Sequence, residues 1–152
     1  MIYPVNSPFR MSSPTWGNRT FFLNGKKVTD FHDGADFISD VSSEVFSILP
    51  GKVVYDKDDY VHLARWTDPH QSAGNMVIVD VEVDGVVYHV RYLHLEENEI
   101  AKGNELKEGQ LIGRYADVGR STGPHLHLDF CSFKNWKKVN PNVLYGKFGM
   151  NL

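Results

Sequence analysis

The chain has 152 residues, of which 41% are hydrophobic and 12% aromatic, and this is enough for one globular domain with one core. Its 16 Lys and Arg residues and 19 Asp and Glu residues give a net charge of -3, and no basic cluster could neutralise a row of phosphates. We therefore expect residues 1–152 to form a single domain that does not bind nucleic acid.

The first ten residues, MIYPVNSPFR, lack the basic start and the apolar stretch of a secretory signal peptide. No apolar run in the chain approaches the roughly 18 residues that span a membrane, so we expect no membrane insertion. If the protein acts outside the cytoplasm, we expect delivery by another route or excision from a longer protein.

Turn-forming residues recur at short intervals and separate segments that are rich in strand-forming residues. This spacing predicts an all-β fold, mainly an antiparallel sheet or sandwich, with little helix. The weak helix candidate spans Gly34 to Ile48, and a C-terminal tail from Lys134 onward is expected to close the fold. The turn signals are Asn24-Gly25, Leu49-Pro50-Gly51, Asp84-Gly85, Gly103-Asn104, Glu108-Gly109 and Ser121-Thr122-Gly123-Pro124.

The stretch FHDGADF, residues 31–37, contains two side chains that could bind a metal ion, His32 and Asp36. In a straight strand their Cα atoms would lie about 13 Å apart, too far for both to reach an ion with bonds of roughly 2 Å. Gly34 permits the chain to bend between them and leaves no side chain in the way of an ion. The alternative, which this stretch alone favours, is a surface loop in which Asp33-Gly34 is only a turn.

The segment DKDDYVHLARWTDPHQSAG, residues 56–74, matches no fixed motif and has the length of a functional or a disordered loop. Its Tyr60 and Trp66 could form one wall of a peptide-binding groove. We interpret His62 and His70 as surface residues first and as substrate contacts second.

A β-hairpin is predicted around Asp84-Gly85, a pair typical of a two-residue type I′ turn. The register of this turn places Asp80 opposite His89, which gives His89 a structural role as the partner of a carboxylate. Extending the register places Asn75 opposite His94, a polar pair at the end of an apolar ladder. The pairs of that apolar face are Val83 with Val86, Val81 with Tyr88, Val79 with Val90, and Val77 with Tyr92.

The stretch STGPHLHLDF, residues 121–130, reads as a strand in which His125, His127 and Asp129 share one face. The two histidine Cα atoms would lie roughly 6.6 Å apart, so both side chains could converge on one small object above the sheet. One of them could bind a metal while the other acts as an acid or base beside it. A pair of solvent-facing histidines is the alternative.

Cys131 is the single cysteine, so an intrachain disulfide is excluded. We interpret it as a small core side chain rather than as a nucleophile.

The motifs FHDGADF, RYLHL and STGPHLHLDF, in this order, resemble those of the lysostaphin-type (LytM-type) zinc endopeptidases, which cut peptide cross-links in bacterial peptidoglycan. The resemblance runs from about Tyr3 to Tyr145, because four further segments are similar to the opening segment, the central strand, a turn and the closing tail of that domain. These segments are PFRMSSPTWGNRT, GNMVIV, GNELKEGQLIG and VNPNVL.

The resemblance implies that His32, Asp36 and His127 bind one Zn²⁺ per chain, and that His94 and His125 are the catalytic histidines beside the metal. Two imidazoles and a carboxylate are typical of hydrolytic zinc sites, which keep one position open for water or for the scissile carbonyl. A nearby histidine can then accept the proton of the attacking water or stabilise the oxyanion.

Two residues are candidates for hydrogen bonds to the substrate. Asn75 is one, because the hairpin register places it opposite His94. Tyr92 has the weaker case, because it also belongs to the apolar ladder.

The resemblance also implies a peptidoglycan peptide as the partner, action at the bacterial cell wall, and a monomer delivered by a phage or excised from a secreted protein. It leaves open whether polyglycine bridges, D-alanyl cross-links or stem-peptide bonds are cut. A rival interpretation is a relative without activity that binds peptidoglycan or regulates wall enzymes.

The sequence departs from the family pattern at two positions. Asp129 replaces a glutamate that usually follows the paired histidines, which would alter the support of a ligand histidine. Ala35 replaces a larger aliphatic residue, and we expect this to affect packing rather than catalysis.

Overall fold

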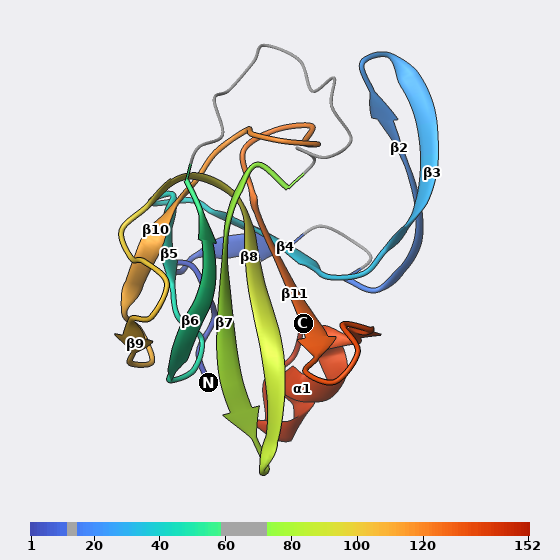
Figure 1. Cartoon of the computed structure of the whole chain (residues 1–152). Coiled ribbons are helices and arrows are strands. Elements are labelled where there is room, and N and C mark those ends of the chain that lie inside the picture. The colour runs from blue at the N-terminus through green and yellow to red at the C-terminus, as the bar shows by residue number, and fades with distance from the viewer. Residues whose placement is uncertain (12–14, 59–72) are drawn as a thin grey trace.

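The structure, a computed structural model, describes residues 1–11, 15–58 and 73–152, and Figure 1 shows the whole chain. Tyr60 and Trp66, the expected groove residues, lie outside the described residues, as do His62 and His70. The described elements are β1 Phe9–Met11, β2 Gly17–Leu23, β3 Lys26–His32, β4 Ala35–Ser39, β5 Glu44–Phe46, β6 Gly51–Lys57, β7 Asn75–Val83, β8 Val86–Asn98, β9 Glu105–Leu106, β10 Leu111–Tyr115, β11 Leu126–Ser132, β12 Lys138–Val139 and α1 Pro141–Lys147.

Antiparallel strands make up nearly all the regular structure of the described residues, which agrees with the predicted all-β fold. The large sheet has ten described strands in the order β1-β4-β11-β8-β7-β6-β9, with β10 pairing with β5 and β8, and β12 with β11. β2 and β3 form a separate two-stranded sheet, which projects to one side in Figure 1. β11 and β8 therefore lie inside the large sheet, where strands on both sides fix their register.

The β7–β8 hairpin has the predicted turn and register. Asp84 and Gly85 have φ values of 52° and 76°, and a type I′ turn requires such left-handed values at both positions. Pairing runs from Val83↔Val86 to Val77↔Tyr92, as the sequence predicts. The face that carries these valines and Tyr92 contributes to the core, so turn chemistry and apolar alternation together determine this part of the sheet.

His89 has the predicted structural role. It lies opposite Asp80 in the hairpin, and its Nδ1 is 2.5 Å from the Asp80 Oδ1 atom. Its ring also stacks on Trp136, with 3.8 Å between the ring centroids. The pairing with a carboxylate and an indole accounts for this buried histidine without a part in catalysis.

The predicted pairing of Asn75 with His94 is wrong because the register shifts by one residue at the end of the hairpin. Met76 lies opposite Leu93 and Asn75 lies opposite Leu95, which leaves His94 as the extra residue of a β-bulge. His94 has a φ of 64°, a left-handed value that is uncommon for a residue other than glycine. The regular alternation would aim its side chain at the core, and the bulge brings it to the outer face of the sheet instead.

The helix predicted within Gly34 to Ile48 is also wrong, because this segment forms β4 and β5. β4 lies between β1 and β11, and Phe37 of β4 is fully buried. Tertiary pairing thus determines the structure of a segment whose local pattern was ambiguous.

The described helix, α1, lies in the C-terminal tail, where VNPNVL contains its start signals. The side chain of Asn140 caps it by accepting a hydrogen bond from the Asn142 N–H, and Pro141 occupies the first turn. Leu144 and Tyr145 of α1 pack into the core, so the tail closes the fold as expected. Nowhere in the described part of the chain does a helix combine the length and the apolar character needed to cross a membrane.

The core fills the inner side of the large sheet, with β1 and β4 crossing behind β7 and β8 in Figure 1. Ala35 and Phe37 of β4 are fully buried in it, so a larger residue at position 35 would have to be accommodated within the core. Cys131 is 1% exposed and has no disulfide partner. Its thiol donates a weak hydrogen bond to the Asp129 carboxylate over 3.8 Å, and its burial fits the expected core role.

Candidate metal centre

Three of the five residues proposed for the metal site converge from three strands. His32 ends β3, Asp36 lies in β4, and His127 of β11 is the direct neighbour of Asp36 across the strand pair. The Asp36 Oδ1 atom lies 3.2 Å from His32 Nε2 and 2.8 Å from His127 Nδ1, and the two nitrogens are 3.3 Å apart. All three side chains are buried, so the strand pairing holds their donor atoms in one small triangle.

The size of this triangle suits a tetrahedral zinc ion. Zinc bonds of 2.0 to 2.1 Å in tetrahedral geometry place neighbouring ligand atoms about 3.3 Å apart. The three measured edges, 3.2, 2.8 and 3.3 Å, lie near that value. Two imidazoles and one carboxylate also match the donor set of hydrolytic zinc sites. These residues can therefore hold zinc while leaving a fourth position for water or substrate.

Gly34 is required for the bend that brings His32 to Asp36. A Cβ atom added at Gly34 would lie 2.5 Å from His127 Nε2 and 2.7 Å from the Leu128 carbonyl oxygen. Real Cβ atoms do not approach other atoms so closely, so the loop can pass across β11 only with glycine at this position.

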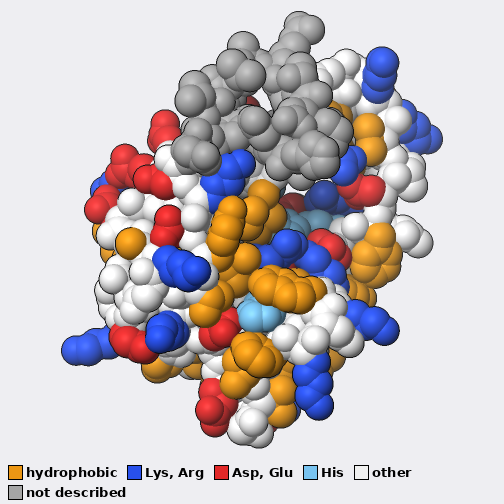
Figure 2. Space-filling view, viewed as in Figure 1, with side chains coloured by type: hydrophobic (Ala, Val, Ile, Leu, Met, Phe, Trp, Pro, Cys, Tyr) orange, Lys and Arg blue, Asp and Glu red, His pale blue; other side chains and the backbone are white. Residues whose placement is uncertain are grey.

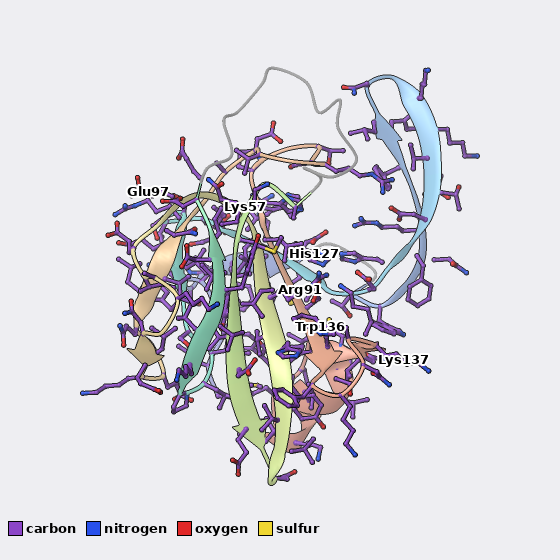
Figure 3. The ribbon with its side chains drawn as sticks, in the orientation of Figure 1. Lys57, Arg91, Glu97, His127, Trp136 and Lys137 are labelled. Atoms are coloured by element: carbon purple, nitrogen blue, oxygen red, sulfur yellow. The ribbon has the colours of Figure 1, made fainter. Side chains whose placement is uncertain are left out.

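A buried carboxylate supports His127 from the side away from the triangle. Asp129 is fully buried, and its Oδ2 lies 3.3 Å from His127 Nε2. Arg91 donates two hydrogen bonds to this carboxylate, at 2.7 and 2.6 Å, and Lys138 donates a third at 2.5 Å. In Figure 3, His127, Arg91 and Trp136 follow one another down β8 and β11. The shorter Asp129 thus keeps contact with His127, and two cations hold its carboxylate in place.

This arrangement shifts the pKa values of His127 and Asp36, two of the three side chains that form the triangle. Burial alone lowers the pKa of His127, but hydrogen bonds to Asp129 and Asp36 outweigh it and raise that pKa to about 9. Burial raises the pKa of Asp36, but hydrogen bonds from His127 and His32 hold it far below its usual range. Because a metal ligand must be unprotonated, binding of an ion displaces the proton from His127 Nδ1, while Nε2–H can stay on Asp129.

The two remaining histidines lie beside the triangle. His125 Nε2 is 3.7 Å from Asp36 Oδ1, and the ring of His94 lies 4.7 Å from the ring of His125 and 6.1 Å from that of His127. The structure therefore brings together all five residues of the proposed centre, from segments that lie far apart in the sequence.

His125 has a defined tautomer. Its Nδ1 lies 2.8 Å from the Gly123 carbonyl oxygen, which can only accept a hydrogen bond, so Nδ1 carries the proton. Nε2, which faces Asp36, is then unprotonated in the neutral ring. His125 can accept a proton at the edge of the centre without changing its other contact.

His94 is a buried neutral imidazole. Burial lowers its pKa well below the usual value, and the neighbouring His125 and His127 lower it further. Its Nδ1 atom is buried and has no hydrogen-bond partner within the described residues. An unsatisfied buried nitrogen costs about 1–3 kcal/mol, so this atom is a candidate for contact with a bound molecule.

Neither of the two expected substrate contacts is among the residues that line the cavity at the centre. Tyr92 is fully buried in the core, and its hydroxyl accepts a hydrogen bond from the Ile48 N–H at 3.1 Å, so its assignment to substrate is wrong. Asn75 is 2% exposed, and its amide donates to the Glu96 carbonyl oxygen at 3.0 Å. This bond spans the bulge at His94, so the contact gives Asn75 a structural role there.

Sequence reasoning did not identify Arg19, which lies in β2. Its Nη1 is 3.1 Å from Asp36 Oδ2, the carboxylate oxygen that the triangle does not use. Arg91 and Lys138 were missed as well, and within the hairpin Arg91 lies opposite Ile78. The pairing of β8 with β11 places it opposite Asp129, and no signal within the hairpin itself predicts that.

A groove of about 750 Å³ opens from the centre. Residues of β2, of the segment Ser39–Ser43 and of the segment Ser121–His125 line it. Figure 2 shows recessed histidines with basic and acidic side chains around them. Asp36, His94, His125 and His127 are among its lining residues, so the groove gives a bound molecule access to the centre.

Comparison with known proteins identifies the family. Peptidase family M23 matches residues 30–141. The chain is 35% identical over 127 residues to the peptidoglycan DD-endopeptidase ShyA of Vibrio cholerae, an alignment that covers 84% of this chain and 26% of that protein. It is 33% identical over 125 residues to lysostaphin of Staphylococcus simulans, covering 78% of this chain and 23% of that protein. The chain thus spans about a quarter of the length of these curated relatives.

Solved structures agree with the sequence relatives. The catalytic domain of the antimicrobial peptidase lysostaphin from Staphylococcus simulans matches with a TM-score of 0.67 and 28% identity, covering 91% of this chain and 92% of that one. A zinc containing peptidase from Vibrio cholerae matches with a TM-score of 0.64 and 31% identity, covering 91% and 37%. The predicted lysostaphin-type fold is confirmed, and the chain belongs to peptidase family M23.

Proposed function

We propose that this chain is a zinc endopeptidase that hydrolyses peptide bonds in the cross-links or stem peptides of bacterial peptidoglycan. The donor triangle of His32, Asp36 and His127 carries the proposal, because its size and composition suit one zinc ion and His94 and His125 lie beside it. The relatives named as peptidoglycan endopeptidases support the substrate class.

Each residue of the centre has a role in this proposal. His32, Asp36 and His127 hold the ion, which in a three-ligand site polarises a carbonyl and makes water a better nucleophile near neutral pH. His125 accepts a proton at Nε2, because Gly123 holds the other ring proton. His94, kept neutral by burial, shares with His125 the tasks of orienting water and stabilising developing charge.

The groove geometry limits how a substrate can bind. The scissile bond must lie beside the histidines that line the groove, and the flanking peptide must lie along the rest of its lining, which includes residues of β2 and of the segment Ser121–His125. We propose that residues 1–152 act as a single monomeric catalytic domain on the wall, in the periplasm or outside the cell. The chain spans only part of its relatives, so delivery by a phage or as part of a longer protein belongs to the same proposal.

Digestion of purified peptidoglycan tests this function. The purified chain, loaded with one equivalent of zinc, is incubated with walls of several cross-link types, and mass analysis identifies the new peptide termini. We expect new amino and carboxyl termini at one kind of peptide bond, and none after removal of zinc with a chelator. Binding to the walls without any new terminus would contradict an enzyme and favour a peptidoglycan-binding or regulatory module.

A further inference from the structure

The described lining of the groove beside the metal centre contains more basic than acidic groups. Among the described residues it has three guanidinium groups, from Arg10, Arg19 and Arg120, and two carboxylates, from Asp36 and Asp40. Arg10 pairs with Asp40 at 3.2 Å. In the metal-loaded protein the positive charge of the ion would balance the negative charge of Asp36. The groove next to the centre thus offers positive charge to a substrate.

Arg19 and Arg120 are held side by side. Asp30 binds both, since its Oδ1 lies 3.0 Å from Arg19 Nε and its Oδ2 lies 3.3 Å from Arg120 Nη2. The Phe21 ring contacts both guanidinium groups, with their central carbons 4.9 and 5.8 Å from its centroid. One carboxylate and one aromatic ring from the β2–β3 hairpin therefore order two arginines together.

This arginine pair is next to the centre and open to solvent. Arg19 reaches Asp36 Oδ2 at 3.1 Å, so a ligand of the triangle is its direct neighbour. The side chains of Arg19 and Arg120 are 27% and 36% exposed, and both line the groove. A group bound by the pair would therefore belong to a residue close to the scissile bond.

The pair has the chemistry of a carboxylate-binding subsite. Arg19 and Arg120 share the carboxylate of Asp30, and a metal ion that engages Asp36 would weaken the second ion pair of Arg19. Guanidinium groups offer five N–H donors in a planar fork that suits carboxylates. Because Asp30 and Phe21 already restrict both side chains, a substrate carboxylate would bind at a reduced cost in side-chain entropy.

We propose that Arg19 and Arg120 bind a free carboxylate of the substrate peptide close to the scissile bond. The inference rests on the proposed function and narrows its substrate class. Peptide stems that carry carboxylates beside the cleaved bond fit the subsite, whereas a bridge of glycine residues has no charged side group to offer it.

A pair of matched peptides tests the subsite. Two synthetic cross-link peptides are prepared that differ in one group next to the scissile bond, a free carboxylate in one and a carboxamide in the other. We expect the parent chain to cleave the carboxylate peptide with a kcat/KM about tenfold higher or more, mainly through KM, which is the range for a hydrogen bond to a charged group. A pentaglycine peptide should be cleaved less well than either.

Substitutions of Arg120 test whether the arginine pair causes the preference for the carboxylate peptide. Arg120→Gln should bring the ratio of the two kcat/KM values close to one, and Arg120→Lys, which keeps the charge but not the fork, should give an intermediate ratio. Arg114→Gln is the matched control, because Arg114 is 39% exposed and also pairs with acidic residues but lies outside the groove lining. It should keep the parent ratio.

The possible results distinguish a failure of the proposed carboxylate subsite from a failure of the proposed endopeptidase function. If the parent chain cleaves both peptides equally well, or Arg120→Gln keeps the preference, the subsite is wrong while the endopeptidase stands. A purely structural role of the ion pairs would change the cleavage of both peptides alike and leave their ratio intact. If neither peptide nor purified peptidoglycan is cleaved, the proposed function fails and the subsite with it.

Discussion

The substitution Gly34→Ala tests whether the bend between His32 and Asp36 sets the geometry of the centre. The added methyl carbon would lie 2.5 Å from His127 Nε2, and ordinary van der Waals contact begins at 3.4 Å. His127 or the loop must therefore retreat by about 0.9 Å. The Leu128 carbonyl oxygen, at 2.7 Å, blocks retreat toward β11 as well.

A displacement of this size is large for a metal site, in which metal–ligand distances deviate from their ideal values by only roughly 0.2 Å. We expect the zinc affinity of Gly34→Ala to fall by about tenfold to a hundredfold, and the free energy of unfolding to fall by about 1–3 kcal/mol. Competition with a chromophoric chelator measures the first quantity, and urea unfolding of the metal-free protein measures the second.

Gly146→Ala is the control for the change from glycine to alanine. A Cβ atom at Gly146 meets no atom within 4 Å, and the residue lies in α1, where alanine is the better helix former. It should leave zinc affinity unchanged and slightly raise stability. If Gly34→Ala binds zinc as tightly as the parent chain, the close approach does not set the ligand geometry and the reasoning is refuted.

Three further substitutions test individual roles. Cys131→Ser should keep turnover, because the buried thiol takes no part in the chemistry, and a folded, zinc-loaded variant without wall-lytic activity would overturn this. Asp129→Asn should weaken zinc binding about tenfold to a hundredfold in a metal titration, because His127 loses its charged partner; unchanged affinity would contradict that support. Tyr92→Phe should lose about 1 kcal/mol of stability with the hydrogen bond from Ile48, but KM for wall fragments should not change. A raised KM would restore Tyr92 as a substrate contact.

Local patterns predicted the β7–β8 hairpin, because the Asp84-Gly85 turn and the alternating valines specify one register. These local patterns did not predict the register shift at the end of the hairpin. The bulge at His94 depends on contacts outside the hairpin, since its backbone N–H donates to Ala73 and its carbonyl accepts from Ala116. The alternating pattern alone therefore predicts, wrongly, that the side chain of His94 points into the core.

The metal centre was predicted through the resemblance of its motifs, since spacing alone left a surface loop and a solvent-facing pair as alternatives. What the sequence could not supply was the pairing of distant strands. β4 against β11 brings Asp36 to His127, and β8 against β11 brings Arg91 to Asp129. Arg19 reaches the centre from the separate β2–β3 sheet, whose position follows from no local pattern.

The central claim is that three residues hold zinc while two histidines beside them carry out the chemistry. Zinc stoichiometry and the rate of wall lysis, measured on the same folded variants, test it most directly. His32→Ala, Asp36→Ala and His127→Ala each remove one donor of the triangle, so they should lose both zinc and activity.

His94→Ala and His125→Ala leave the triangle whole. They should keep close to one zinc per chain and lose about a hundredfold or more in lysis rate, the usual effect of removing an acid, base or oxyanion-stabilising group. If His125→Ala loses zinc while His127→Ala keeps it, the ligand assignment is reversed. If all five variants lyse walls at the parent rate, the centre is not catalytic and the account is wrong.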